Sequence, residues 1–333
     1  MNISMKTWLD EMLNDKQVRF APILYYPGLS LVDWNAKETL QEGGAEKMAL
    51  TMKALVERFP DMAFVMTGLD TSADAESFGC QVMYAEDRAP HTVSVVAHTQ
   101  EDVDGLELPD VYGGRFATQY EAVRRAKELI QDRPVFGNMT APFTTASMLM
   151  PLAEAMTNVV KNPDLMHALI EKCTQHAINR AKAYKEAGAD GIMLNDATGG
   201  VIPPKMNAAY SAAYIKRVVD AVQDDHFIVM MHNCGNIARS LKHIYGTGCR
   251  LYSFGNNLDM TKALESLPAD AMVLGNVDPM KMVSENPEEI TTLCKEVLEK
   301  AEPYGHFILS TGCDCPPDVK LENADAMLQA LKN

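Results

Sequence analysis

The chain has 333 residues, of which 47% are hydrophobic, and a formal net charge of −15 at pH 7. This length is ordinary for one α/β barrel or for two smaller domains, and it allows a large buried core. The negative charge argues against binding to a phosphate backbone, so we expect no nucleic-acid partner.

The N-terminal residues and the cysteines indicate the cellular location of the protein. Residues 1–17 are charged and amphipathic rather than an apolar signal core, and no run of about 18 apolar residues occurs that could span a bilayer. Seven cysteines, an odd number in a large chain, do not suit a secreted disulfide framework. We therefore expect a cytoplasmic protein with mostly reduced thiols and no membrane partner.

In chain order, residues 1–20 are predicted to form a helical extension, after which strand-like apolar runs alternate with helical segments. The predicted strands are Ile23–Tyr26, Ala63–Thr67, Pro134–Asn138, Gly191–Asn195, Phe227–His232, Arg250–Phe254, Ala271–Gly275 and His306–Ser310. The helical spacing is clear at Tyr120–Gln131, Pro163–Ala187, Ala208–Val222, Met260–Ser266 and Pro287–Ala301.

This alternation predicts the α/β fold class, with residues 1–333 as a single (β/α)8 TIM barrel and no linker to a second domain. Short continuous Val, Ile, Leu and Met runs suit a parallel sheet that is buried on both faces. The pattern weakens within 68–133, where 92-TVSVVAHT-99 alternates like an antiparallel strand. We expect an excursion from the barrel in that region.

Polar segments follow six of the predicted strands. In a barrel of this kind the loops after the strands converge on one face, which carries the chemistry. The segments are GNM at 137–139, NDATGG at 195–200, HNCGN at 232–236, SFGNN at 253–257, GNVDP at 275–279 and STGCDC at 310–315.

Three of these residues form a candidate metal site. His232 and Cys234 lie two positions apart at the end of a strand, so both side chains point to the same side. Cys313 follows the last strand, whose loop faces that of the fifth strand across a closed barrel. Imidazole and thiolate donors favour zinc, and three protein ligands leave one tetrahedral position open, as in catalytic zinc sites.

Other interpretations of the cysteines stay open. Taken alone, His232 and Cys234 could be core residues, because free cysteine is among the most buried residue types. Cys315 competes with Cys313 as a ligand, and the two could instead form a redox pair.

Four further polar residues at strand ends are predicted to line the substrate pocket. Asp196 and Asn276 are expected to orient a bound acceptor by hydrogen bonds. Since Asp and Asn are common loop residues, a purely structural role is the alternative for each. The predicted set is Asn138, Asp196, Asn256 and Asn276.

Several segments, in the same order, resemble the uroporphyrinogen decarboxylase superfamily, whose fold is a (β/α)8 barrel. AESFGCQV at 75–82 resembles the family's EAExxG segment, and GNMTAPFTTASML at 137–149 its GPFT segment. GADGIMLNDATGGVIPP at 188–204 resembles its GADxIxxxD segment. HNCGN, GNVDP and the stretch 310–327 then follow in family order.

Departures from the decarboxylase pattern favour the branch of cobalamin-dependent methyltransferases, typified by methylcobalamin:coenzyme M methyltransferase. The decarboxylases carry an arginine-rich N-terminal motif for substrate carboxylates, whereas 25–34, YYPGLSLVDW, has no arginine. Their tyrosine and C-terminal histidine correspond to Met148 and Cys313. The branch's His-x-Cys and distant Cys zinc ligands correspond to His232, Cys234 and Cys313. In that branch an acidic residue after the sixth strand lies near the metal. The corresponding stretch here reads SFGNNLD, so that role could fall to Asn256 or Asp259.

The resemblance implies a zinc-dependent methyltransferase that moves a methyl group between a methylcobalamin-type corrinoid and a zinc-bound thiol. Because no DxHxxG-type corrinoid-binding sequence occurs, we expect the corrinoid on a separate partner protein. The first alternative takes the methyl group from a methoxylated or N-methylated small molecule. Two further alternatives are a uroporphyrinogen decarboxylase-like lyase and a non-catalytic zinc-binding or corrinoid-docking module.

Overall fold

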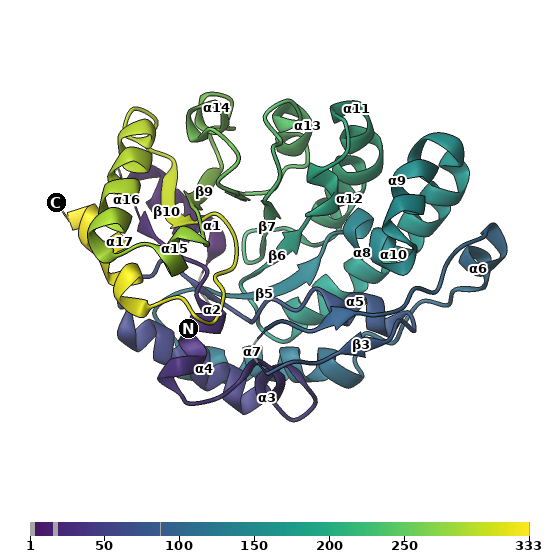
Figure 1. Cartoon of the computed structure of the whole chain (residues 1–333), viewed down its shortest axis with the longest axis horizontal. Coiled ribbons are helices and arrows are strands. Elements are labelled where there is room, and N and C mark those ends of the chain that lie inside the picture. The colour runs from purple at the N-terminus through teal and green to yellow at the C-terminus, as the bar shows by residue number, and fades with distance from the viewer. Residues whose placement is uncertain (1–3, 16–18, 87, 333) are drawn as a thin grey trace.

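A computed structural model describes residues 4–15, 19–86 and 88–332. Parallel strands form its centre and helices surround them (Figure 1). The eight parallel strands of the described chain are β1 (Arg19–Phe20), β2 (Val65–Met66), β5 (Val135–Thr140), β6 (Gly191–Asn195), β7 (Ile228–Asn233), β8 (Leu251–Phe254), β9 (Met272–Val277) and β10 (Phe307–Thr311).

The sheet curls into a barrel. Its strands pair in the order β1-β10-β9-β8-β7-β6-β5-β2. A parallel bridge between Phe20 and Met62 links β1 to the segment that enters β2, and the Ala63 amide donates a 2.8 Å hydrogen bond to the Phe20 carbonyl. The predicted (β/α)8 fold is confirmed.

The predicted first strand, Ile23–Tyr26, is wrong. The pairing of β1 with β10 ends at Phe20, opposite Leu309, and the Ile23 amide then donates to the side chain of Thr311 instead of a backbone carbonyl. Residues Tyr25–Gly28 form the short helix α2. This segment is buried in either conformation, so its apolar character alone could not distinguish strand from helix.

The N-terminal extension contains helix α1, Met5–Asn14. Residues 19 and 20 of the predicted extension belong to the barrel sheet, while 1–3 and 16–18 lie outside the described residues. The helix packs its apolar side against the ends of the barrel strands, where Met5, Leu9 and Met12 are buried with interior residues such as Phe64 and Met230.

Between β2 and β5 the chain leaves the barrel. Strands β3 (Val82–Met83) and β4 (His91–Thr92) pair antiparallel in a separate two-stranded sheet. Helix α6 (Gln100–Gly105) lies at the right edge of Figure 1, and α7 (Gly114–Leu129) returns the chain to β5. The alternating pattern of residues 92–99 predicts a longer antiparallel strand than β4. The pairing ends early because the amides of Val96 and Ala97 donate to the Leu149 carbonyl instead.

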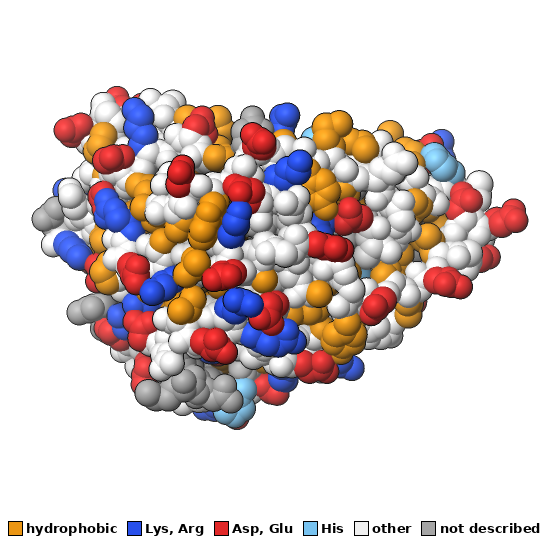
Figure 2. Space-filling model, turned by 90° about the horizontal axis from the view of Figure 1, so that it is seen from below, with side chains coloured by type: hydrophobic (Ala, Val, Ile, Leu, Met, Phe, Trp, Pro, Cys, Tyr) orange, Lys and Arg blue, Asp and Glu red, His pale blue; other side chains and the backbone are white. Residues whose placement is uncertain are grey.

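The remaining helices surround the barrel. They include α3 (Ala36–Leu40), α4 (Ala45–Arg58), α5 (Ser72–Ser77), α8 (Pro142–Leu149), α9 (Leu152–Lys161), α10 (Pro163–Glu186), the π-helix η3 (Asn207–Ala212), α12 (Ala213–Val222), α13 (Leu241–Tyr245), α14 (Met260–Glu265), α15 (Lys281–Ser284), α16 (Pro287–Ala301) and α17 (Leu321–Lys332). No helix in the described ranges has the length and apolar character needed to cross a membrane. On the face drawn in Figure 2, acidic and basic side chains are interspersed, as on a solvated surface.

The barrel interior changes from apolar to polar along the strands. Every second residue of a strand points inward. In the lower layers these inward residues are apolar, for example Met193, Met230 and Leu274. Two positions further along each strand they are polar and buried, and this polar layer contains Asn138, Asn195, His232, Ser253, Asn276 and Ser310. It lies at the carboxyl ends of the strands, where the loops begin.

Candidate metal centre

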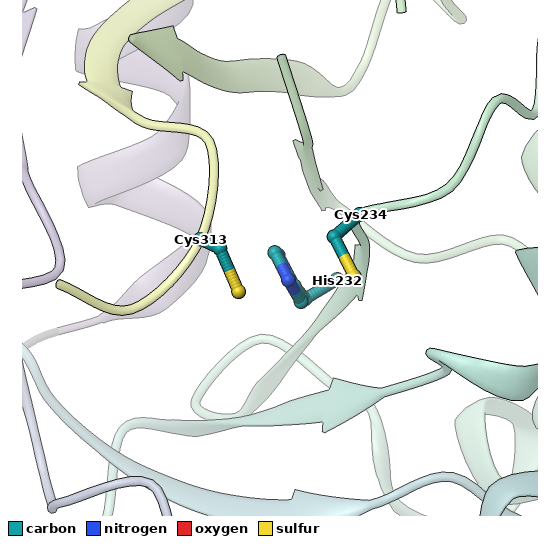
Figure 3. Close-up of side chains that lie close together, drawn as sticks. All are labelled: His232, Cys234 and Cys313. Atoms are coloured by element: carbon teal, nitrogen blue, oxygen red, sulfur yellow. The ribbon is translucent and has the colours of Figure 1, made fainter. Parts of the chain in front are cut away.

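Three side chains from two distant parts of the chain converge at the carboxyl ends of the strands (Figure 3). His232 is in β7, Cys234 follows that strand directly, and Cys313 follows β10. One potential ligand atom from each lies within 4.8 Å of the other two. Within the described chain, no other group of three His, Cys, Asp or Glu residues meets this condition.

The imidazole of His232 is oriented by the neighbouring strand. Its Nδ1 lies 2.9 Å from the Oγ of Ser253, which is the register partner of His232 in β8. Its Nε2 is buried without a hydrogen-bond partner. A buried polar atom without a partner costs free energy, and a metal ion at Nε2 would remove that cost. Ser253 was not predicted as a site residue, although its inward position in the predicted strand could have indicated it.

The two thiols of the site differ in their tendency to ionise. The Cys313 thiol, as a hydrogen-bond donor, and the nearby imidazole of His232 lower the pKa of Cys234 to about 4. The same contact with Cys234, together with burial, raises the pKa of Cys313. Proximity of the two sulfurs therefore favours one thiolate even before a cation binds, and a bound cation would favour both.

Cys315 lies apart from this group. Its side chain is 1% exposed and belongs to the apolar core around the barrel, and its amide donates to the Ile23 carbonyl. Burial raises the pKa of its thiol. The geometry therefore favours Cys313 over Cys315 as the third ligand.

Comparison with known proteins identifies the family. Residues 41–333 match the family described as Uroporphyrinogen decarboxylase (URO-D). The chain belongs to this family. It is 27% identical over 332 residues to the Methylcobamide:CoM methyltransferase MtbA of Methanosarcina mazei, with 96% of each chain covered. It is 30% identical to the Uroporphyrinogen decarboxylase of Myxococcus xanthus, over 70% of this chain and 68% of that protein.

A solved structure supports the fold. A methyltransferase from Methanosarcina mazei superimposes with a TM-score of 0.83 at 23% identity, covering 99% of this chain and 98% of that one. The resemblance drawn from the sequence motifs is thus confirmed at the level of the URO-D family, and the similarity to MtbA agrees with the predicted branch.

In this URO-D family chain, Asn233, which lies between His232 and Cys234, connects this end of β7 to the loop after β6. Its Nδ2 donates 2.6 Å to the carbonyl of Asp196, and its Oδ1 accepts from the Gly235 amide at 2.8 Å. A Cβ at Gly200 would lie 2.3 Å from the Asn233 Oδ1, so only glycine fits there. Asn233 was not predicted as a site residue, because its partner Asp196 lies in another loop.

Asp196 lies at the end of β6 as predicted, and its carboxylate is fully buried. Burial raises its pKa to about 7, although the nearby side chains of Ser211 and Asn233 oppose that shift. The Oδ1 atom has no partner at normal hydrogen-bond distance. A Cβ at Gly199 would lie 2.0 Å from the Asp196 Oδ2, which explains the glycine of the NDATGG segment.

The three predicted asparagines have different surroundings. Asn138 is buried and its Oδ1 accepts from Asn195, within the polar layer. Asn276 donates both amide hydrogens to the loop after β8, to Gly255 O at 3.0 Å and Leu258 O at 2.8 Å, which leaves only its carbonyl oxygen for a substrate. Asn256 is exposed, and its Nδ2 donates 3.0 Å to Asp278. Their roles toward a substrate stay predictions.

The role of the expected acidic residue near the metal stays a prediction for Asn256 or Asp259. Asp259 caps α14 by accepting from the Thr261 amide at 3.2 Å, and Asn256 has no carboxylate. Asp314, next to Cys313, was not considered from the sequence. The residue is partly exposed, but its Oδ1 atom is buried without a hydrogen-bond partner, and burial raises the pKa of the carboxyl.

Proposed function

We propose that this protein is a zinc-dependent methyltransferase that moves a methyl group between a corrinoid carried by a partner protein and a small thiol. The observation that carries the proposal is the convergence of His232, Cys234 and Cys313, whose ligand atoms lie within 4.8 Å of one another. The relatives named Methylcobamide:CoM methyltransferase, similar over 96% of the chain, support the same reaction class.

The donor set fits zinc. One imidazole nitrogen and two sulfurs are ligands that zinc prefers, and His232 Nε2 is buried without another partner. Three protein ligands leave a fourth position for the acceptor. A thiol bound to zinc there would be deprotonated near neutral pH, whereas a free thiol has a pKa of about 8.5.

Each residue of the site then has a defined task. Ser253 holds the imidazole so that Nε2 faces the cation, and Cys234 and Cys313 hold it from two loops. Asn138, Asp196, Asn256 and Asn276 are proposed to contact the acceptor around it. The methyl group leaves its corrinoid carrier without the bonding electron pair and forms a carbon–sulfur bond with the acceptor thiolate.

The corrinoid protein is proposed to dock over the loops at the carboxyl ends of the strands, because the three side chains lie at those ends. The first half-reaction, in which a methoxylated or N-methylated compound donates a methyl group to the corrinoid, would use the same face. The loops that line the pocket would distinguish the two half-reactions, but their sequences are the most variable part of a barrel.

Methylcobalamin gives a direct assay, because loss of its methyl group changes its visible spectrum. Zinc-loaded protein with a panel of small thiols should demethylate it, and Cys234→Ala should abolish the change. Methylation of a cobalt(I) corrinoid by methoxylated or N-methylated compounds, with no thiol active, would instead support the first-step alternative. Inactivity in both directions, with zinc and the cognate corrinoid protein supplied, would refute the proposal.

A further inference from the structure

The loop after β8 lies between the two loops that carry the cysteines. A Cβ at Gly255 would lie 2.7 Å from the Cα and 2.7 Å from the carbonyl oxygen of Cys234. On the other side, a Cβ at Gly312, next to Cys313, would lie 2.7 Å from the Asn256 amide nitrogen and 3.2 Å from the Gly255 Cα. The three loops are therefore in direct backbone contact, with Gly255 in the middle.

Space rather than backbone conformation requires glycine at these two positions. Neither Gly255 nor Gly312 has the positive φ that disfavours other residues, in contrast to Gly275 with φ of 150°. An alanine could adopt either backbone conformation, but its methyl group would overlap main-chain atoms. Main-chain atoms cannot rotate aside as the end of a long side chain can.

Hydrogen bonds prevent this middle loop from moving away. The Gly255 amide donates to the Asn233 carbonyl at 3.0 Å, and its own carbonyl accepts from Asn276 Nδ2 at 3.0 Å. The Gly312 amide donates to the Val277 carbonyl at 2.7 Å. A methyl group at Gly255 would thus displace Cys234 rather than the loop that holds Gly255.

We infer that Gly255 and Gly312 are positioning residues which set the separation of the Cys234 and Cys313 sulfurs. The backbone between them acts as a spacer of fixed thickness, so that both sulfurs reach one cation. This inference rests on the metal site of the proposed function but not on methyl transfer. It also assigns a structural role to Asn276, because the side-chain amide of Asn276 holds the Gly255 carbonyl of this spacer.

The test compares Gly255→Ala and Gly312→Ala with Gly44→Ala. Gly44 is a matched control, since a Cβ there would lie 2.4 Å from the Thr39 carbonyl oxygen, an equally severe main-chain overlap outside the site. Zinc affinity is measured by competition with a chromogenic chelator. Loading with Co²⁺ reports the sulfur ligands through the intensity of the thiolate-to-cobalt absorption.

We expect Gly255→Ala and Gly312→Ala to bind zinc at least about tenfold more weakly than the wild type, as is typical for loss of a ligand-orienting contact. Their thiolate-to-cobalt absorption should fall, because one sulfur moves out of reach. Gly44→Ala should lose thermal stability but keep the wild-type zinc affinity and cobalt spectrum. Melting of the metal-free proteins identifies any variant that does not fold, in which case the other glycine variant decides.

Wild-type zinc affinity and an unchanged cobalt spectrum in a folded Gly255→Ala or Gly312→Ala protein would overturn the inference. A wild-type protein that binds Co²⁺ without thiolate absorption would overturn it as well. Coordination of the metal by both thiolates without any methyl transfer would refute the proposed function. The inference about Gly255 and Gly312 would still stand.

Discussion

At the scale of single residues, two cysteines two positions apart, Cys313 and Cys315, have opposite surroundings. The Cys313 side chain is half-buried beside His232 and Cys234, whereas that of Cys315 is almost completely buried among apolar residues. The turn after β10 separates them, so one thiol faces the site and the other the core. From the sequence alone either cysteine could be the metal ligand. The direction in which each side chain points depends on the conformation of that turn.

Removing each cysteine in turn tests this division. Wild-type protein should contain about one zinc per chain. Cys313→Ala should lose most of that zinc, because the cation would keep only two protein ligands. Cys315→Ala should retain it and lose roughly 1 kcal/mol of unfolding free energy from the small cavity. Metal analysis of both purified variants decides, and zinc loss only in Cys315→Ala would show that the ligand assignment is wrong.

Ser253 offers a second test at this scale. Ser253→Ala removes the hydrogen-bond partner of His232 Nδ1, so zinc affinity should fall by about 10- to 100-fold. Ser310→Ala is the control, because Ser310 lies in the same polar layer but donates to the Ala21 carbonyl at 2.7 Å. Equal zinc affinity in the two variants would show that Ser253 does not orient the ligand.

At the scale of elements, a buried charge network ties the excursion to the barrel. Asp74 in α5 accepts from His176 Nε2 at 2.9 Å and from Arg180 Nη1 at 2.7 Å, both in α10. It also accepts from the amide and hydroxyl of Thr140 at the end of β5. Asp74 and Arg180 are at most 1% exposed, so removing one partner leaves an uncompensated buried charge.

Asp74→Asn should therefore lower the unfolding free energy by about 3–5 kcal/mol at pH 7. Burial opposes ionisation of Asp74, but Arg180 and His176 outweigh it and hold its pKa below the ordinary value of 3.8. Its contribution is then complete above pH 3.8 and is lost as the pH falls through the lower folded-state pKa. Urea unfolding of both proteins at pH 7 measures this loss. Equal free energies of unfolding in wild type and variant would contradict this origin.

The elements also show how far the sequence predicts this fold. Continuous apolar runs such as Gly191–Asn195 and Phe227–His232 identified barrel strands nearly to the residue, because both faces of a parallel sheet are buried. The run around Ile23–Tyr26 failed because α2 is also buried, with Gly28 packed against Leu55 of α4. The sequence predicts which segments are buried, but the residue at which a strand ends depends on where its hydrogen-bonded neighbour strand ends.

At the scale of the whole molecule, the site is assembled from loops that are distant in sequence. Spacing within one strand predicted His232 and Cys234, and the order of family motifs pointed to Cys313. The supporting residues Ser253 and Asn233 were not predicted, since their partners are set by strand register and loop packing. The donors were thus readable from sequence, but the contacts that orient them required the fold.

The same scale separates this chain from the decarboxylases it resembles. The segment 25–34 contains no arginine, and its Tyr25–Gly28 part is a buried helix. The substrate's carboxylates would find no charge partners there, and an unpaired buried carboxylate costs several kcal/mol. We predict no turnover when purified protein is incubated with uroporphyrinogen. Formation of coproporphyrinogen would contradict this prediction.

The central claim is that a thiol acceptor binds at a cation held by His232, Cys234 and Cys313. X-ray absorption at the zinc edge tests it most directly, because it counts the sulfur ligands of the metal. Without thiol, the zinc of the purified protein should have one protein nitrogen and two sulfur ligands, the latter at about 2.3 Å. Saturation with the thiol that is most active toward methylcobalamin should raise the sulfur count to three. A count that stays at two under the same conditions, or a zinc that lacks thiolate ligands from the start, would contradict the account.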